Sequence, residues 1–232
     1  MTSTTAPPRP LPPALLHNLR RVTGDEKHDA AAHSTLDVLW VLHDRVLRLR
    51  PDDPAAPGRD RFLLSKGHGP ASYYAVLATA GFFPERWLDD LAGPTAPLGH
   101  HPDRLLVPGV EISCGSLGHG LPLAVGLARG LDLTGEAGDV HVLVGAAELD
   151  EGSNHEAIAL AGRWGLRRLR CVVVDNASAT LGWPGGIARR FEVEGWSSAH
   201  ADAADHDALH AALTTPADGP HVTVVRTVRK GA

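Results

Sequence analysis

Two apolar runs constrain the fold of this chain more than any other feature. "VHVLVG" (140–145) and "LRCVVVD" (169–175) are apolar without alternation, and a helical pattern separates them. Such runs are typical of strands buried on both faces, as in a parallel sheet covered by helices. "RFLLS" (61–65) and "HVTVVRTV" (221–228) predict further strands. The sequence therefore predicts an α/β fold of three layers, a doubly wound, mostly parallel sheet with helices on both faces.

Composition limits the class of protein. The chain has 232 residues, two cysteines and a net charge of −5, without a basic block. This charge gives no electrostatic basis for binding nucleic acid or an anionic membrane, and no apolar run reaches transmembrane length. Two cysteines outside any disulfide or metal-binding pattern favour a reducing cytoplasm. Residues 1–13, rich in Pro and Thr, are expected to form a disordered or extended arm before a single domain over 14–232.

Apolar residues at helical spacing predict the elements between the strands. Ser34 would begin and cap one helix, with Asp37 three residues later. The helix after 140–145 would bury a stripe made of Ala157, Leu160, Ala161 and Trp164. Further helices are expected over 73–80, from Pro84, from Pro122 and over 206–213. Residues 93–120 are expected to form a long loop, of a kind that is usually functional or disordered.

Two turns follow the central strands and carry the polar residues of interest. "GAAELDEG" follows 140–145, and "DNASATLG" follows 169–175. Ligands of parallel α/β sheets bind beyond the carboxyl ends of strands, where backbone N–H groups can hold a diphosphate. Asn176 can supply an oxygen ligand to Mg²⁺. Ordinary strand-to-helix turns with local capping are an equally good interpretation of these short motifs taken alone.

Histidines mark two loops. "LLSKGHGPASYY" places His68 between glycines before a helix, where it can meet a phosphate or simply cap the helix. "PLGHHPDR" places His100 and His101 side by side. Adjacent histidines tend to point apart, and no HExxH or paired CxxC motif is present, so the pattern does not favour zinc.

The joint order of these motifs resembles the N-terminal, diphosphate-binding domain of transketolases. "FLLSKGHGPASYYAVLATAGFFP" is similar to the family's Ser-Lys-Gly-His segment, and "PGVEISCGSLGHGLPLAVGLA" to its Gly-Ser-Leu-Gly-Gln-Gly segment. "VLVGAAELDEGSNHEAIALAGRWGLRRLRCVVVDN" resembles the thiamine diphosphate motif, which usually reads Gly-Asp-Gly and ends in Asn. The resemblance runs from about residue 15 to the end of the chain.

The resemblance implies a cofactor, a metal and a partner. It implies thiamine diphosphate bound with Mg²⁺, and transfer of a two-carbon ketol unit from a ketose to an acceptor. The family's pyrimidine-binding domain, which carries the Glu that activates the cofactor, is absent from these 232 residues. The chain thus resembles the N-terminal subunit of a split transketolase. This likeness implies a C-terminal partner subunit, in a heterotetramer with two copies of each chain.

Site residues are implied by their match to the family's motifs. The implied catalytic residues are His68, His101 and Glu151, with Glu151 and Glu156 at a subunit interface. The implied cofactor-binding residues are His68, Gly115, Ser116, Leu117, Gly145, Ala146, Ala147, Glu148, Asn176 and Ser178. Asn176 and the carbonyl of Ser178 are the implied metal ligands. A solvated helix face remains the alternative for Glu156.

Four departures from the family pattern qualify this interpretation. The usual Gly-Asp-Gly reads Gly145-Ala146-Ala147, which removes the carboxylate ligand of Mg²⁺. An early Gly-His-x-Gly segment is missing, His119 replaces the usual Gln, and the sequence ends before a later loop that brings another active-site His. Two alternatives follow: a non-catalytic structural or regulatory partner whose cofactor site has decayed, or another thiamine diphosphate enzyme, either deoxyxylulose-phosphate synthase-like or an acyl transferase.

Overall fold

The structure, a computed structural model, contains one parallel sheet. It describes residues 10–22, 34–67, 70–177, 179 and 181–227. The strands are β1 (Arg61–Leu64), β2 (Val140–Gly145), β3 (Leu169–Asp175), β4 (Ser197–Asp202) and β5 (His221–Arg226). Their order is β1-β2-β3-β5-β4, and every neighbouring pair is parallel. The predicted α/β class is confirmed, and β2 and β3 have the predicted bounds.

The central strands are buried because their apolar side chains alternate between two cores. Leu143 and Val172 belong to one core cluster, whereas Val142 and Val173 belong to the other. Each face of the sheet therefore needs a cover, which explains why the apolar runs do not alternate with polar residues. The unpredicted strand β4 pairs only with β5 within the described residues, and its polar sequence "SSAHAD" is consistent with an edge position.

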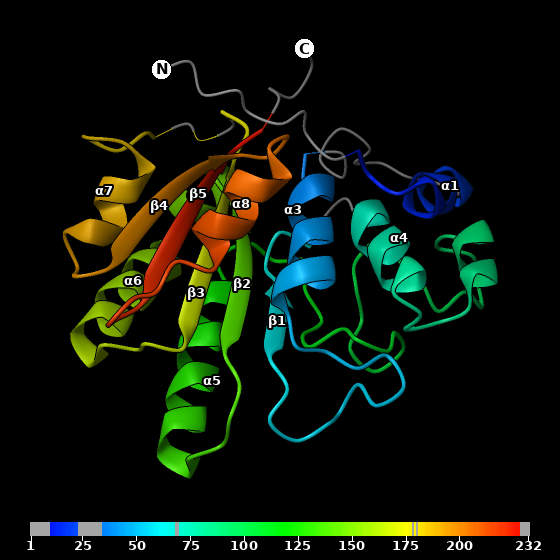
Figure 1. Cartoon of the computed structure of the whole chain (residues 1–232), viewed down its shortest axis with the longest axis horizontal. Coiled ribbons are helices and arrows are strands. Elements are labelled where there is room, and N and C mark those ends of the chain that lie inside the picture. Colours follow the sequence, from blue (N-terminus) through cyan, green and yellow to red (C-terminus); the bar gives the residue numbers. More distant parts are fainter. Residues whose placement is uncertain (1–9, 23–33, 68–69, 178, 180, 228–232) are drawn as a thin grey trace.

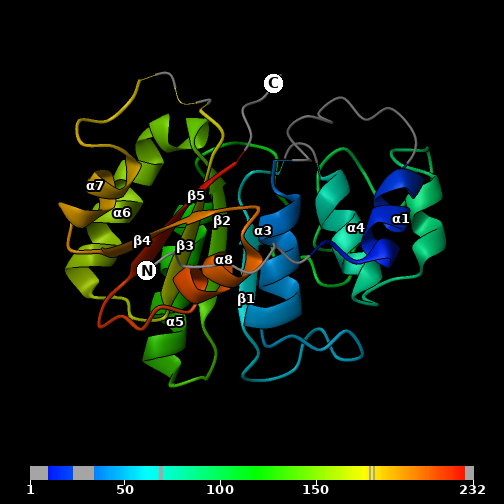
Figure 2. The ribbon, with the colours of Figure 1, turned by 45° about the horizontal axis from the view of Figure 1, so that its top comes forward.

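Helices cover both faces of the sheet (Figure 1). On one face lie α5 (Gly120–Thr134), α6 (Gly152–Trp164) and α7 (Ile187–Glu192), which share a core with the sheet. On the other lie α3 (Leu36–Val41), which continues as the π-helix η1 (Leu42–Val46), and α8 (His206–Leu213). Both views place α1 (Pro13–Arg21) and α4 (Ala71–Thr79) beyond the β1 edge (Figures 1 and 2). This arrangement is the predicted three-layer, doubly wound fold.

The loops also agree with the sequence in most places. Residues 93–119 contain turns and bends but no helix or strand, and Pro122 lies in the first turn of α5. Pro84 caps the short 3-10 helix η2 (Glu85–Asp89). Of the predicted arm, only residues 10–13 are described, and Pro13 already begins α1, a helix that was not predicted.

Two local predictions are wrong. Helix α3 is capped at Thr35, not at Ser34, and without a side-chain hydrogen bond; the Ser34 hydroxyl instead accepts a hydrogen bond from Lys66 Nζ at 3.2 Å. In α6, Leu160 and Trp164 are 36% and 45% exposed, while Ile158 is buried. The buried face of α6 carries smaller residues because the helix packs closely on its neighbours.

Close packing is clearest where α6 meets the end of α7. Gly162 of α6 lies directly against the carbonyl group of Glu194. A methyl group at position 162 would overlap that carbonyl oxygen, so any larger residue would push the two segments apart. Position 162 therefore requires glycine, because the two backbones lie too close together for a side chain.

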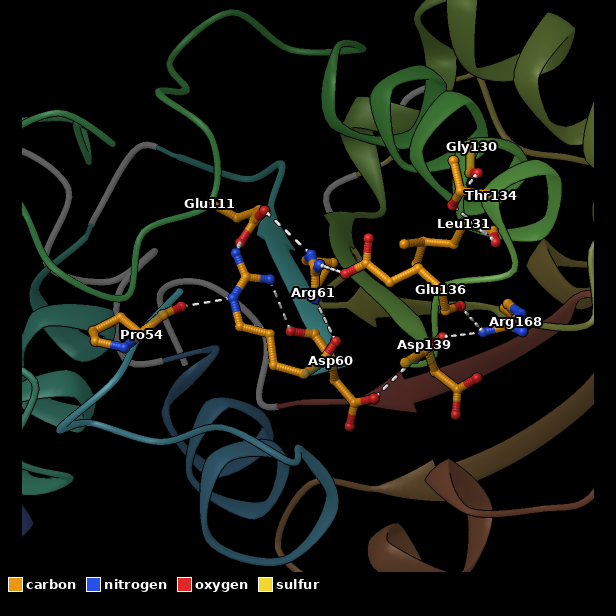
Figure 3. Close-up of polar contacts among 12 residues, drawn as sticks. Pro54, Asp60, Arg61, Glu111, Gly130, Leu131, Thr134, Glu136, Asp139 and Arg168 are labelled. Atoms are coloured by element: carbon orange, nitrogen blue, oxygen red, sulfur yellow. Dashed lines mark hydrogen bonds and ion pairs between the residues drawn. The ribbon is translucent and has the colours of Figure 1, made fainter. Parts of the chain in front are cut away.

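A dense set of ion pairs closes the amino end of the sheet (Figure 3). We call it the amino-end cluster; its residues are Arg48, Arg59, Asp60, Arg61, Glu111, Glu136 and Asp139. Arg61 donates to Glu136 at 2.6 Å, and Arg59 donates to Glu111 at 2.8 Å. The buried Asp60 accepts hydrogen bonds from Arg48 and from the backbone N–H of Asp139. Burial raises the pKa of Asp60, but these hydrogen bonds outweigh it, so the pKa lies below its usual value.

Candidate functional site

The candidate site lies where β1, β2 and β3 end side by side. The backbone N–H of Ala146 donates to the carbonyl of Val174 at 3.0 Å, which joins the turn after β2 to the end of β3. Ser65 follows β1 and donates its N–H to Leu143 of β2 at 2.9 Å. The parallel register thus brings three separate sequence motifs to one edge of the sheet.

A buried carboxylate connects these ends. Glu148 lies in η3 (Ala147–Asp150), the 3-10 turn between β2 and α6, and is 1% exposed. One carboxylate oxygen accepts hydrogen bonds from the Ser65 hydroxyl and from the N–H of Gly118 at 3.0 Å. The other accepts from the N–H of Gly145 at 3.3 Å. These bonds join the turn after β2 to the residue after β1 and to the loop before α5.

The same bonds decide which backbone groups remain for a ligand. Because the N–H groups of Gly118 and Gly145 point at Glu148, they do not point at a diphosphate. Burial raises the pKa of Glu148, and the hydrogen bonds from Ser65, Gly118 and Gly145 oppose this rise. Glu148 thus faces the protein interior, although the sequence placed it among the cofactor-binding residues.

The loop over residues 115–120 is fixed by close contacts. Gly118 has φ of +79°, and a side chain there would come within 2.7 Å of the Cβ of Glu151. The carbonyl of Gly118 accepts a hydrogen bond from the Ser153 hydroxyl at 2.6 Å. Gly120 donates its N–H to the Ser65 hydroxyl oxygen at 3.0 Å and lies against that side chain. Glycine is required at both positions, so the resemblance at this loop has a structural reason.

His101 lies beside the same loop. A Cβ at Gly115 would lie 3.0 Å from the His101 ring, which places this exposed histidine against the loop. Leu117 is half-buried, and Ser116 is exposed. Glu151 is exposed at the start of α6, and its side chain makes no capping hydrogen bond to that helix. His68 and Ser178, two further predicted site residues, lie outside the residues that the structure describes.

Asn176 is the clearest ligand candidate at this edge. It is 7% exposed, and within the described part of the chain its Oδ1 atom has no hydrogen-bond partner. The backbone turns sharply after it, since Ala177 has φ of +55° and donates its N–H to Asp175 at 3.0 Å. A buried amide oxygen without a partner is costly unless a ligand satisfies it, and amide oxygens suit Mg²⁺.

The turn after β2 supplies no comparable ligand. Ala146 is buried, and its methyl group has no donor atom. Across the described residues, no group of three or more His, Cys, Asp or Glu side chains is placed to hold a metal ion. The arrangement therefore fits a metal held partly by Asn176 and by other groups, such as cofactor oxygens or water.

A second cluster holds the loop that follows Asn176, and sequence reasoning missed it. Arg190 is 6% exposed, lies over the Trp183 ring at 5.0 Å and pairs with Asp150 at 3.7 Å. Its guanidinium also contacts His155, and Asp150 accepts the N–H of Leu181 at 3.3 Å. Burial lowers the pKa of Arg190, which the charge of Asp150 partly offsets. The segment "RRFEVEGW" (189–196), which contains Arg190, is the sequence signal that could have indicated this cluster.

The fold and the position of the site are those of a parallel α/β domain with a ligand site at the carboxyl edge of its sheet. Residues 22–230 match the family described as "Transketolase, thiamine diphosphate binding domain". Since that match spans most of the sequence, the chain belongs to the transketolase family. The predicted resemblance to an N-terminal transketolase domain is confirmed.

Relatives with known names add two observations. The chain is 51% identical over 219 residues to "Ferredoxin fas2" of Rhodococcoides fascians, covering 94% of this chain and 71% of that protein. It is 36% identical over 213 residues to one subunit of an apulose-4-phosphate transketolase from Actinobacillus succinogenes, covering 88% of this chain and 77% of that protein. The ferredoxin name does not extend to this sequence, because iron–sulfur clusters are usually held by four cysteines and it has two.

Solved structures agree on the fold. The transketolase of Campylobacter jejuni superposes with a TM-score of 0.75 at 23% identity, covering 92% of this chain and 37% of that chain. The chain therefore spans little more than a third of such single-chain transketolases. Among the described residues, no helix combines the length and apolar character needed to cross a membrane.

Proposed function

We propose that this chain is the diphosphate-binding subunit of a two-subunit enzyme that transfers a two-carbon ketol unit from a ketose to an aldose or related acceptor. The observation that carries the proposal is Asn176, whose buried Oδ1 atom has no partner among the described residues, at the edge where the family's motifs converge. Relatives named as subunits of an apulose-4-phosphate transketolase and of a 6-deoxy-6-sulfo-D-fructose transketolase support the two-subunit organisation.

The cofactor would lie along the carboxyl edge of the sheet. When bound, thiamine diphosphate supplies the carbanion chemistry that breaks and forms the carbon–carbon bond. The residues proposed to hold it are His68, Gly115, Ser116, Leu117, Gly145, Ala146, Ala147, Asn176 and Ser178. Leu117 would pack against it, and the backbone N–H of Ala147, at the start of a 3-10 turn, would donate to its diphosphate. His101 would face substrate oxygens from the loop beside Gly115.

The proposed metal is Mg²⁺ with an unusual set of ligands. Asn176 Oδ1 and the carbonyl of Ser178 would be the protein ligands, because Ala146 offers none. Mg²⁺ often keeps several waters and relies on substrate phosphates, so fewer protein ligands are compatible with binding. We expect a metal held more weakly than in relatives that have Asp at this position.

The partner would be a C-terminal subunit that carries the pyrimidine-binding domain, in a heterotetramer with two copies of each chain. The outer faces of α5 and α6 suit an interface, because Leu123, Leu160 and Trp164 are 51%, 36% and 45% exposed. Glu151 and Glu156 are exposed as well, just before α6 and on it. Both cysteines are free, which is consistent with a cytoplasmic enzyme.

The test is cofactor binding by the assembled complex. The chain would be coexpressed with a candidate C-terminal subunit from the same organism, and the purified complex titrated calorimetrically with thiamine diphosphate, with and without Mg²⁺. Binding followed by ketol transfer from candidate ketoses is expected. A complex that binds no thiamine diphosphate under either condition would contradict the proposal.

A second candidate function is a non-catalytic partner whose cofactor site has decayed, and Ala146 is the observation that favours it. Ala146→Asp separates the two, with Ala146→Asn as a control of equal size without charge. Under our proposal the natural complex is already active, and Ala146→Asp raises the Mg²⁺ affinity about tenfold or more, by analogy with other changes at metal sites. An inactive natural complex that only Ala146→Asp activates would favour decay. A deoxyxylulose-phosphate synthase-like or acyl-transfer reaction is less well supported, because the relatives named above are transketolase subunits.

A further inference from the structure

The hydrogen bonds of Glu148 extend beyond what its sequence position implies. Glu148 is 1% exposed, and both of its carboxylate oxygens accept hydrogen bonds. The donors come from three segments: Ser65 after β1, Gly118 in the loop before α5, and Gly145 at the end of β2. Ser65 and Glu148 are 83 residues apart in sequence, and Gly118 lies 30 residues before Glu148.

Each of these three segments forms part of the proposed cofactor site. Ser65 is two residues before Gly67, in the "SKGH" segment, and its hydroxyl oxygen also accepts the N–H of Gly120. Gly118 lies between the proposed cofactor contact Leu117 and the start of α5. Gly145 is the last residue of β2, directly before the turn that would face the diphosphate. A change in the Glu148 carboxylate would therefore move all three segments at once.

The backbone of Glu148 is fixed as well. Its carbonyl oxygen accepts a hydrogen bond from Asn154 Nδ2 at 2.6 Å, and Asn154 is fully buried in α6. The Ser153 hydroxyl, one residue earlier, donates to the carbonyl of Gly118. The first turn of α6 therefore holds Glu148 and the 115–120 loop from the same side, which leaves the carboxylate little freedom to turn toward a ligand.

We infer that Glu148 is a positioning residue of the cofactor site, which acts by holding the 115–120 loop and the turn after β2 in register and does not contact the cofactor or the metal itself. This inference rests on the proposed function, since it assumes that thiamine diphosphate binds at this edge. It deepens that function by assigning to Glu148 a role different from that of the metal-binding Asp which the family places two residues earlier. Ser65 belongs to the same arrangement as the donor that connects Glu148 to Gly120.

Because both carboxylate oxygens of Glu148 accept hydrogen bonds, Glu148→Gln tests the positioning role directly. In Glu148→Gln the side chain keeps its shape, but its amide presents N–H donors where Glu148 now accepts. At least one of the N–H groups of Gly118 and Gly145 then loses its acceptor or faces another donor. Ser65→Ala is a milder change, because it removes one donor to Glu148 and the acceptor of the Gly120 N–H while keeping the carboxylate.

A matched control is available in the same turn. Leu149 is 1% exposed and packs in the core between the sheet, α5 and α6, and its apolar side chain cannot form a hydrogen bond to the 115–120 loop. Leu149→Ala should lower the melting temperature of the complex through the lost packing. It should leave the affinity for thiamine diphosphate within about twofold of the natural complex, as expected for a residue without a positioning role.

The experiment measures cofactor affinity and melting temperature separately, using the assembled two-subunit complex and thiamine diphosphate with Mg²⁺ as the probe. We expect Glu148→Gln to weaken the affinity about 10- to 100-fold and Ser65→Ala about 3- to 10-fold, a scale typical of groups that orient ligand-binding residues. Leu149→Ala should lower the melting temperature as much as these two variants or more. Its affinity for thiamine diphosphate should nevertheless fall much less than theirs.

The possible outcomes separate a failure of the positioning role of Glu148 from a failure of the proposed function. If the natural complex binds the cofactor and Glu148→Gln binds it equally well, the positioning role is wrong. Should Glu148→Gln fail to fold, Ser65→Ala decides, and an unchanged affinity in that variant overturns the role. An equal loss of affinity in Leu149→Ala would assign the effect to general destabilisation and would also overturn it. If the natural complex does not bind thiamine diphosphate at all, the proposed function itself fails.

Discussion

The two ends of the sheet use their polar groups differently. In the amino-end cluster, Asp60, Arg61 and Glu136 are paired with opposite charges or backbone groups at 2.6 to 2.8 Å. At the carboxyl end, Asn176 keeps a buried oxygen without a partner in the described residues, and Ala146 stands where the resemblance to the family implies a carboxylate. Paired charges indicate a role in stability, whereas a buried amide oxygen left unpaired at the edge where ligands of parallel sheets bind indicates binding.

The largest expected effect is on the pH dependence of folding, and it concerns the amino half of the sheet. Burial lowers the pKa of His43 and His141 to about 4, against about 6.5 in an unfolded chain. Between these values the unfolded chain binds more protons, so stability is full above pH of about 6.5 and is lost as the pH falls toward about 4. Each histidine accounts for up to about 3 kcal/mol of this loss in the unfolding free energy.

Denaturant unfolding between pH of about 7.5 and about 4.5 would measure this loss, since the window spans most of the interval between the two pKa values. His141→Val should flatten the dependence of the unfolding free energy on pH in this window. Leu133→Ala, at an exposed position of α5 without a titratable group, serves as the control and should leave the slope unchanged. An equal slope in His141→Val and in the natural chain would show that His141 is not a buried neutral group.

Next in size is the buried acid of the amino-end cluster. Asp60→Ala removes the acceptor for the backbone N–H groups of Arg48 and Asp139, which should lower the unfolding free energy by about 2 kcal/mol. Cofactor affinity should not change, because the substitution lies at the opposite end of the sheet from Asn176. Asp52→Ala removes an exposed pair with Arg50 and should lower stability much less, because solvent screens such pairs. Urea titration of the three proteins tests this order.

The third substitution lies at the carboxyl end, where a small effect on stability is expected together with a large effect on binding. Asn176→Ala removes a buried oxygen that has no partner in the described part of the chain, so the unfolding free energy should change by no more than about 1 kcal/mol. The Mg²⁺-dependent affinity for thiamine diphosphate, measured by calorimetry on the assembled complex, should nevertheless fall about tenfold or more.

Asn18→Ala is the matched control for this substitution. Asn18 is also buried, and its Oδ1 atom likewise has no partner among the described residues, but its Nδ2 atom donates to Thr79 and Glu85 at 3.0 Å. Its loss should lower stability and leave cofactor binding intact. If the two asparagine variants behave alike, the contrast drawn between stability and binding regions is wrong.

Sequence reasoning succeeded where a local pattern determines the structure. Continuous apolar runs gave β2 and β3 their bounds, because a strand buried on both faces has no polar alternative. It failed for β4, whose polar residues reach the sheet only as an edge strand on β5. The buried stripe of α6 was misplaced at Leu160 and Trp164, since close packing against the end of α7 favours small residues.

The site could be predicted only in part, for a related reason. The family motifs located the converging turns and Asn176, but the direction of a side chain depends on distant segments. Glu148 points inward because Ser65 and Gly118 supply hydrogen bonds, and neither partner is visible in the motif around it. Nothing in the sequence alone distinguishes a residue that contacts a cofactor from one that holds the contacting loops.

The contact between Gly162 and Glu194 has a mechanical consequence. Because the two backbones are in direct contact, α6 and the end of α7 are expected to move together as one rigid unit. This unit carries the exposed side chains of Leu160 and Trp164. It also carries Arg190, which lies over Trp183 in the segment that follows Asn176. A displacement of α6 would thus reach Trp183 through its contact with Arg190.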